Sequence, residues 1–93
     1  MRCAACGHAL ARERDRMPLE TSTFVNPAGV VCRIAAFLEA AGCLIGGDPT
    51  AYWTWFPGHA WQYALCGKCG GHVGWAFTGP SRFYGLLAER IVE

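Results

Sequence analysis

The sequence WFPGHAWQYALCGKCGGHVGWAF, residues 55–77, holds a Cys-x-x-Cys pair with tryptophans on both sides of it. A second pair lies in CAACG, residues 3–7. Both pairs end in Cys-Gly, and glycine lets the backbone turn sharply so that amide N–H groups point at thiolate sulfur. Two such knuckles can form a tetrahedral four-thiolate zinc site. We therefore predict one structural Zn²⁺ that joins two distant parts of the chain, with the ligands Cys3, Cys6, Cys66 and Cys69.

The length and composition indicate one folded domain, residues 1–93. Of the 93 residues, 53% are hydrophobic and only 16% are charged, which is not the composition of a disordered chain. So short a chain buries a limited core, and a stabilising metal or disulfides would be no surprise. Six cysteines without a recognisable secretion signal favour a reducing compartment. We therefore expect a cytoplasmic protein with metal-binding cysteines, and redox-active dithiols or disulfides are the alternative.

Charge and hydropathy argue against two classes of partner. The net charge is +1, Lys68 is the single lysine, and the one charged cluster, residues 12–16, alternates in sign. A surface that follows nucleic-acid phosphates needs clustered lysine and arginine, so we expect no nucleic-acid partner. No apolar run approaches the roughly 20 residues that span a bilayer, so we expect no membrane partner.

The remaining cysteines and the histidines form no catalytic motif. Cys32 and Cys43 lie in apolar surroundings and are expected to be small buried hydrophobes. A closed four-thiolate shell leaves no open position for a reactive water molecule. No carboxylate pair or nucleophile–base motif accompanies His8, His59 or His72, which we interpret as structural or surface residues. The sequence therefore favours a protein that is not an enzyme.

Most of the chain has the pattern of short strands between glycine and proline turns. Residues 71–77 alternate, which predicts a strand with one face formed by Val73, Trp75 and Phe77. Residues 61–66 are aromatic and apolar and lead into the second knuckle. Pattern alone does not decide between helix and strand for residues 30–38 and 83–92.

Three of the four tryptophans are placed to form a cluster. Trp55 and Trp61 flank the turn at residues 56–60, and antiparallel strands on either side would bring the two indoles together. Trp75 follows the second knuckle, so a bound zinc ion could hold all three indoles in one place. Such a cluster can be an aromatic core, or a pocket with flat apolar walls that suits a small ring or a quaternary ammonium group. The physics of these residues leaves both interpretations open.

The motifs together resemble the CULT domains, the thalidomide-binding domains of cereblon and of its single-domain bacterial relatives. Besides residues 55–77, the resemblance rests on CAACG at 3–7, FVNPAG at 24–29, LIG at 44–46 and FYGLLAERIV at 83–92. It implies an all-β fold, a β-tent of two antiparallel sheets at roughly right angles, pinned by one structural zinc ion. It also implies that residues 30–38 and 83–92 are strands.

The resemblance further implies a ligand site for cyclic imides, such as the glutarimide of thalidomide-type compounds, and for uracil-like rings or C-terminal cyclic imides on damaged proteins. The backbone of residues 53–55 would hydrogen bond the imide, and one cage indole would donate to its second carbonyl. The implied residues are a cage with its base, a loop over the pocket mouth and a backbone segment: Trp55, Trp61 and Trp75 with Phe77, then Asn26 and Pro27, then Trp53 and Thr54. Trp53 stands where human cereblon has a histidine, and we interpret it as a rim residue.

The preferred interpretation is a monomeric, non-enzymatic binding module, stabilised by zinc, that captures a cyclic imide or a related ring. One alternative is an enzyme similar to the methionine-sulfoxide reductases, which share the β-tent. The closing strand at 83–92 lacks the cysteine that those enzymes use. The other alternative is a structural zinc module that docks a protein or nucleic acid, with the tryptophans as its core.

Overall fold

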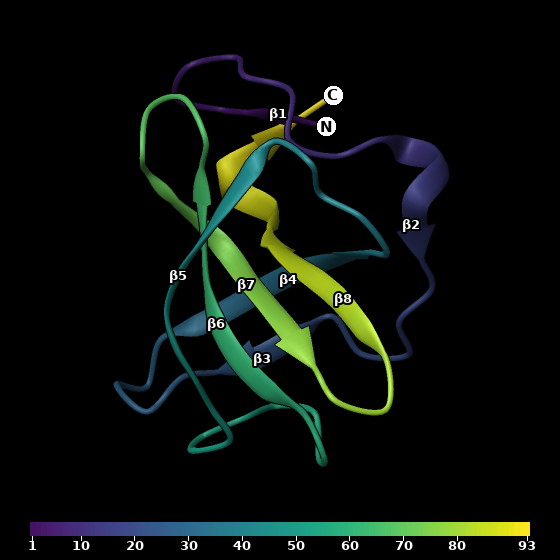
Figure 1. The fold of residues 1–93 in the computed structure, drawn as a ribbon, viewed down its shortest axis with the longest axis vertical. Helices are drawn as coiled ribbons and strands as arrows, with labels where there is room; N and C mark the ends of the chain where they lie inside the picture. The colour runs from purple at the N-terminus through teal and green to yellow at the C-terminus, as the bar shows by residue number, and fades with distance from the viewer.

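The computed structural model describes all of residues 1–93 as strands, turns and two short 3₁₀ helices (Figure 1). The elements are β1 (Arg2–Cys3), η1 (Glu13–Asp15), β2 (Arg16–Met17), β3 (Thr23–Val25), β4 (Val31–Phe37), β5 (Cys43–Thr50), β6 (Ala60–Cys66), β7 (His72–Thr78), β8 (Arg82–Leu87), η2 (Ala88–Arg90) and β9 (Ile91–Val92). A seven-stranded sheet has the order β2-β4-β8-β7-β6-β5, with β3 also paired to β4, and β1 and β9 form a second sheet. The predicted all-β fold of two antiparallel sheets is confirmed. Neither 3₁₀ helix has the length or apolar character of a membrane-spanning segment.

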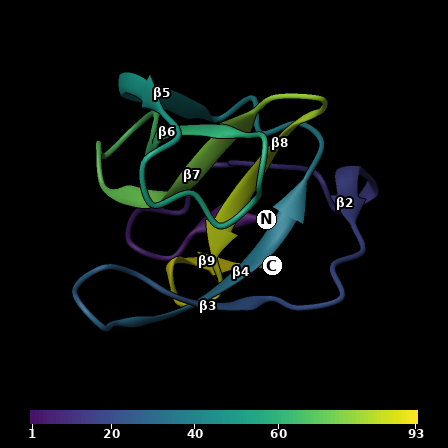
Figure 2. The ribbon, with the colours of Figure 1, turned by 90° about the horizontal axis from the view of Figure 1, so that it is seen from below.

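The strands lie in two layers that are joined at one ladder. Figure 2 shows β5, β6 and β7 on one side of the molecule and β3 and β4 on the other. In Figure 1, β3 and β4 cross the direction of β6 and β7. The layers are continuous where β4 pairs with β8, with Ile34 opposite Leu87 and Phe37 opposite Tyr84. This crossing gives the tent-like arrangement of strands that the resemblance implied.

The core consists of apolar side chains contributed by both layers. Phe37 on β4, Phe77 on β7 and Leu86 on β8 are at most 2% exposed. Full burial of one such side chain stabilises a protein by about 1.5–3 kcal/mol. No polar or charged side chain is buried. The strands are therefore held together by apolar packing and backbone hydrogen bonds, without buried ion pairs.

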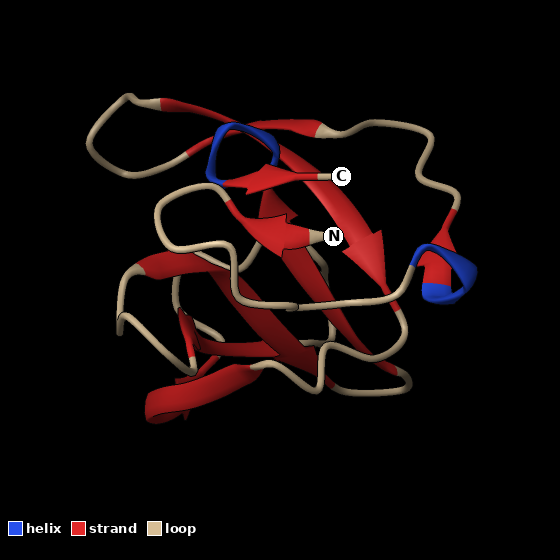
Figure 3. Ribbon diagram, turned by 90° about the horizontal axis from the view of Figure 1, so that it is seen from above, coloured by secondary structure: helices blue, strands red, loops and turns tan.

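Both ambiguous segments form strands, although one of them is interrupted. Residues 31–37 form β4, within the predicted range of 30–38. The strand predicted at 83–92 is instead β8, the turn η2 and β9 (Figure 3). The interruption arises because β8 pairs with β4 and β7, whereas β9 pairs with β1 in the other sheet. It brings the end of the chain to the first knuckle, where Ile91 pairs with Cys3.

A bulge between β6 and β7 changes the predicted faces of β7. The ladder skips Val73, because its neighbours His72 and Gly74 pair with consecutive residues of β6. One extra residue in a strand shifts the alternation of side chains. Val73 therefore packs into the main core cluster, whereas His72 lines a pocket together with Trp75 and Phe77. The prediction that Val73 shares a face with Trp75 and Phe77 is wrong, because strict alternation ends at the bulge.

Gly74 is a position where β7 tolerates no side chain. A Cβ atom there would collide with the backbone oxygen of Gly85 on β8 and lie 2.8 Å from the Cα of Leu86. These backbone atoms cannot move without separating β7 from β8, so Gly74→Ala should lower the free energy of unfolding by about 3 kcal/mol. Urea denaturation measures the loss. Gly46→Ala is the matched control, because its Cβ would meet only the Leu65 side chain, at 3.4 Å; equal stability of the two variants would disprove the explanation.

Candidate ligand pocket and metal centre

The two cysteine knuckles meet in a compact cluster. The Sγ atoms of Cys3, Cys6, Cys66 and Cys69 lie within 4.8 Å of one another. The Sγ atoms of Cys6 and Cys66 are 3.5 Å apart, and those of Cys3 and Cys69 are 3.8 Å apart. Sulfur atoms bound at about 2.3 Å to one tetrahedral metal ion are about 3.8 Å from each other. The structure thus brings all four predicted ligands together at the spacing of a tetrahedral metal site.

Each knuckle has the backbone turn that the Cys-Gly sequence predicts. Gly7 and Gly70 have φ angles of 77° and 75°, in the left-handed region that glycine adopts without strain. The Gly7 N–H donates to the carbonyl of Cys3 at 2.8 Å, and the Gly70 N–H donates to that of Cys66 at 2.9 Å. In the second knuckle, the Lys68 N–H also points at the Cys66 Sγ, at 3.4 Å. The two knuckles are therefore equivalent turns that direct their thiols toward a common centre. In the second knuckle an N–H group also points at one of the sulfur atoms.

The thiols of the cluster have opposite tendencies to ionise. Burial raises the pKa of Cys66, but N–H groups of Cys69 and Lys68 and the Cys6 thiol lower it by more, to about 6. At Cys6, a backbone hydrogen bond from His8 lowers the pKa, whereas burial and the neighbouring sulfurs together raise it to about 11. Four thiolates so close together repel one another, and a bound cation is what permits all four to ionise. Metal binding should therefore weaken as the pH falls, because protons compete for the sulfurs.

The other two cysteines lie outside this cluster. Cys32 is buried beside Ile34 and Leu87, as expected for a small hydrophobe. Cys43 is only partly buried and pairs with Cys66 across β5 and β6. Burial raises the pKa of both thiols, that of Cys43 to about 11. Both side chains therefore remain protonated and unreactive near neutral pH.

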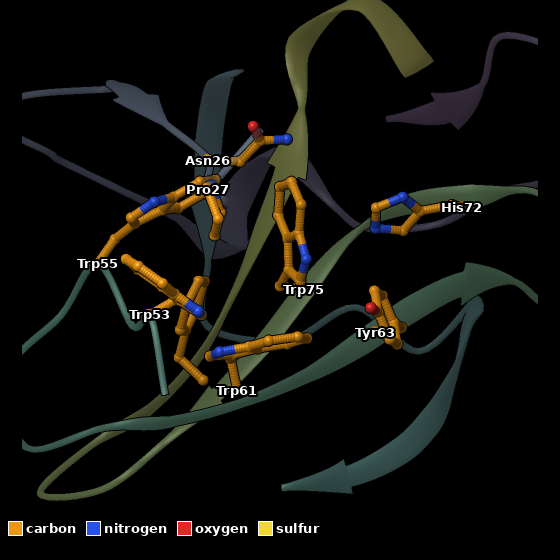
Figure 4. A pocket seen from close by; sticks show the side chains of 9 residues that line it. Asn26, Pro27, Trp53, Trp55, Trp61, Tyr63, His72 and Trp75 are labelled. Atoms are coloured by element: carbon orange, nitrogen blue, oxygen red, sulfur yellow. The ribbon is translucent and has the colours of Figure 1, made fainter. Parts of the chain in front are cut away.

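A cavity of about 380 Å³ opens among the tryptophans (Figure 4). Its walls come from β6, β7, the loop before β6 and the loop between β3 and β4. The lining residues are Asn26, Pro27, Trp53, Trp55, Trp61, Tyr63, His72, Trp75 and Phe77. All predicted ligand residues except Thr54 are among them. The volume lies within the range of roughly 300–1,000 Å³ that is typical of small-molecule pockets.

Aromatic contacts fix the orientation of the cage walls. The rings of Trp55 and Trp75 are 4.9 Å apart and nearly perpendicular, at 74°. On its other side Trp55 stacks on Phe24, with 5.0 Å between centroids and 12° between planes. Trp61 meets Tyr63 edge-on at 5.2 Å. The three indoles are only partly buried, so each leaves ring surface open to the cavity.

Two of the three cage indoles are also held by hydrogen bonds. The Trp55 Nε1 donates to the carbonyl of Val25 at 3.2 Å, and the Trp61 Nε1 donates to that of Tyr52 at 2.7 Å. These bonds pair the N–H groups of two indoles and help to fix the positions of their rings. The N–H of Trp75 has no partner within the chain. It remains available to a ligand, and in Figure 4 its nitrogen lies on the side toward Tyr63 and His72.

The predicted base and mouth of the pocket are both present in the structure. Phe77 is 2% exposed and contributes only a small surface to the cavity. Phe56 packs edge-on against Phe77, with 4.7 Å between ring centroids, and supports it from outside the lining.

At the mouth of the pocket, the Asn26 Oδ1 accepts hydrogen bonds from the N–H groups of Ala28 and Val30, at 3.0 and 2.9 Å. These bonds close the loop that carries the pocket-lining Asn26 and Pro27.

The two residues before Trp55 differ in their position. Trp53 lines the cavity and is 62% exposed, in keeping with its interpretation as a rim residue. Thr54 does not line the cavity. Its hydroxyl donates to the carbonyl of Phe56 and accepts from the N–H of the same residue, both at 3.3 Å. The side chain of Thr54 therefore shapes the turn, and only its backbone is open to a role in ligand binding.

Tyr63 and His72 line the pocket but are not among the predicted ligand residues. Tyr63 follows Trp61 by two positions on β6, and side chains with that spacing share a face, so the pattern could have identified it. His72 reaches the pocket face only because of the bulge. Its ring lies 5.4 Å from that of Tyr63 and 4.9 Å from that of Trp75, edge-on to both. These two residues extend the cage on the side of the second knuckle.

The surroundings of His72 favour its neutral form. Burial lowers its pKa, and this effect, with a smaller contribution from Arg90, outweighs the hydrogen bond to Gly74, which raises it. The Nε2 lies 2.8 Å from the carbonyl oxygen of Gly74. A proton on Nε2 satisfies that contact and leaves Nδ1 as a hydrogen-bond acceptor.

These features define a class of protein: an all-β domain that combines a four-cysteine metal site with a tryptophan-walled pocket. No model of a known protein family matches the chain. The chain is similar to cereblon of Gallus gallus (37% identity over 77 residues, 76% of the chain) and of Xenopus tropicalis (38% over 82 residues, 77% of the chain). Its identity to cereblon of Drosophila pseudoobscura pseudoobscura is 30% over 101 residues, covering 96% of the chain. The chain belongs to the cereblon-like CULT domains.

The similarity concerns one part of each relative. The alignments cover 17% of cereblon from Gallus gallus, 18% from Xenopus tropicalis and 16% from Drosophila pseudoobscura pseudoobscura. The chain thus spans about one sixth of the length of these proteins. The function of this domain is therefore inferred from its own pocket and not from the functions of the whole relatives.

Proposed function

We propose that this domain is a non-enzymatic binding module that captures a small cyclic imide in its tryptophan cage. The proposed ligands are glutarimides, thalidomide-type compounds, uracil-like rings and C-terminal cyclic imides on damaged proteins. One observation carries the proposal: three indoles with fixed orientations surround a cavity of about 380 Å³ instead of filling it. Flat apolar walls of this kind suit the apolar CH₂ edges of a glutarimide ring.

The chemistry of the four sulfurs supports zinc as the metal of this module. Thiolate ligands at tetrahedral spacing are typical of structural zinc sites, whereas calcium and magnesium prefer oxygen ligands. A shell of four thiolates has no free position for water, so the proposed role of the zinc ion is structural. The spare thiols Cys32 and Cys43 do not line the cavity, which gives no support to the reductase alternative.

The backbone beside the cage offers polar groups that match an imide. The carbonyl of Trp53 and the N–H of Trp55 form no hydrogen bond within the chain, whereas the N–H of Thr54 already donates to Ala51 at 3.2 Å. An imide presents one N–H between two carbonyls. It would donate to the Trp53 carbonyl and accept from the Trp55 N–H, and the unpartnered indole of Trp75 would donate to the second carbonyl.

Titration with glutarimide, followed by tryptophan fluorescence, tests the proposal. We expect a saturable change with a dissociation constant of roughly 0.1 mM, which is within the binding free energy that so small a ligand can supply. N-methylglutarimide is the matched control ligand. It lacks the imide N–H and leaves the Trp53 carbonyl unpaired, so its affinity should be at least about tenfold lower. No saturable change at millimolar glutarimide would refute the proposal, and equal affinities would refute the assigned hydrogen bond.

A further inference from the structure

Trp53 combines an outer position in the cavity with a strained backbone. Its φ angle is 64°, and it is the only residue other than glycine with a positive φ. The left-handed region is unfavourable for a bulky side chain. Strain of this kind persists only where the surrounding structure imposes it, and it is concentrated at ligand sites.

Packing within the chain does not account for an indole at this position. The Trp53 side chain is 62% exposed, and its ring meets only that of Tyr52, edge-on at 5.2 Å. Tyr52 is itself 71% exposed. The indole N–H of Trp53 has no hydrogen-bond partner within the chain. Neither burial nor hydrogen bonding therefore favours a large aromatic residue here over a glycine.

Contacts on both sides of Trp53 impose its conformation. The Tyr52 N–H donates to the Thr50 hydroxyl at 3.1 Å, and the Thr54 N–H donates to the Ala51 carbonyl at 3.2 Å. The carbonyl of Tyr52 accepts the Trp61 indole N–H at 2.7 Å. The segment is therefore fastened to a wall of the cage. Figure 4 shows the Trp53 ring between those of Trp55 and Trp61.

We propose that Trp53 is a specificity-determining outer wall, which stacks on a flat aromatic substituent carried by the caged ring. This inference rests on the proposed function and narrows its ligand class to imides with a planar extension. A cavity of about 380 Å³ has room for more than one six-membered ring. An exposed indole presents an open face for a planar group, and such aromatic pairs favour binding beyond the area they bury.

Calorimetric titration of two probes tests this inference: unsubstituted glutarimide and a glutarimide that carries a phthalimide group. The measured quantity is the ratio of their affinities. Trp53→Ala should lower the preference for the substituted probe about tenfold, and Trp53→Phe, which keeps an aromatic face, should lower it less than about threefold. Leu44→Ala is the control, because Leu44 is 60% exposed on β5 and lies outside the cavity lining; its ratio should match that of the unchanged protein.

A second measurement, without ligand, tests whether the backbone at Trp53 is strained. Glycine adopts the left-handed region freely and alanine does not, so Trp53→Gly should melt at a higher temperature than Trp53→Ala. An unchanged affinity ratio in Trp53→Ala, or a melting temperature of Trp53→Gly at or below that of Trp53→Ala, would overturn the inference while leaving the proposed function standing. Failure of the unchanged protein to bind either probe would overturn the proposed function, and this inference with it.

Discussion

Removal of the proposed zinc ion is expected to unfold the domain. The four-cysteine cluster joins the N-terminal knuckle to the turn between β6 and β7. Structural zinc contributes about 10–16 kcal/mol in small zinc-binding peptides, which is comparable to the about 5–15 kcal/mol that stabilises a typical domain. A zinc chelator should therefore abolish the near-UV circular dichroism signal of the packed aromatic residues. Cys66→Ser should have the same effect, because it removes one ligand at the buried centre of the cluster.

The matched control for the metal experiment is Cys32→Ser. Cys32 is also buried, but it lies outside the cluster, and its Sγ points at the Val30 carbonyl at 3.7 Å. A serine hydroxyl can donate to the same carbonyl, so the loss of stability should be about 1 kcal/mol, without loss of metal. Metal analysis on the same samples shows whether the chelator has acted. A metal-free protein with an intact near-UV signal would disprove the structural role of the metal.

Loss of one cage wall is expected to weaken imide binding strongly while the domain stays folded. Trp61→Ala removes an aromatic wall and also the hydrogen bond that holds the Tyr52 carbonyl at 2.7 Å. Removal of such an anchor costs binding at least about 2 kcal/mol, or about 30-fold in glutarimide affinity. Because Trp61 is only partly buried, the loss of folding stability should be about 1–2 kcal/mol, below the 3–5 kcal/mol of a fully buried tryptophan. Calorimetric titration and urea denaturation measure the two effects separately.

Two further variants separate the wall from the polar contact. Trp75→Phe keeps most of the aromatic packing but removes the unpartnered indole N–H, so it should weaken glutarimide binding about tenfold. Tyr52→Ala is the control, because this exposed side chain does not line the cavity; the affinity should change less than about twofold. If Trp61→Ala and Trp75→Phe both unfold, the tryptophans are an aromatic core, and the pocket interpretation is wrong.

The metal ligands could be predicted because their geometry is encoded locally. Each Cys-x-x-Cys-Gly segment contains its own turn, with Gly7 and Gly70 at positive φ. The only long-range condition was that the two knuckles meet. The cage could not be derived in the same way, because the residues alone left core and pocket equally open. The resemblance to CULT domains favoured the pocket, and the cavity around the three indoles is in keeping with it.

The features that sequence reasoning missed depend on pairing between strands. The bulge at Val73 follows from the register of β7 against β6, and it brings His72 into the pocket. The interruption between β8 and β9 reflects their pairing with different sheets. The left-handed backbone of Trp53 is imposed by hydrogen bonds to residues on either side and to a cage wall. None of these partners is indicated by the side-chain pattern of a single segment.

The most direct test of imide capture is a ¹H–¹⁵N correlation spectrum of the zinc-loaded domain recorded during titration with glutarimide. The spectrum resolves each indole and backbone N–H group of the cage. We predict saturable shifts of the Trp75 indole and Trp55 backbone signals, because these two N–H groups have no partner in the chain and are the proposed donors to the imide carbonyls. The signal of Leu44, outside the cavity, should stay in place. Unchanged Trp75 and Trp55 signals at millimolar glutarimide would contradict the proposal that this domain captures cyclic imides in its tryptophan cage.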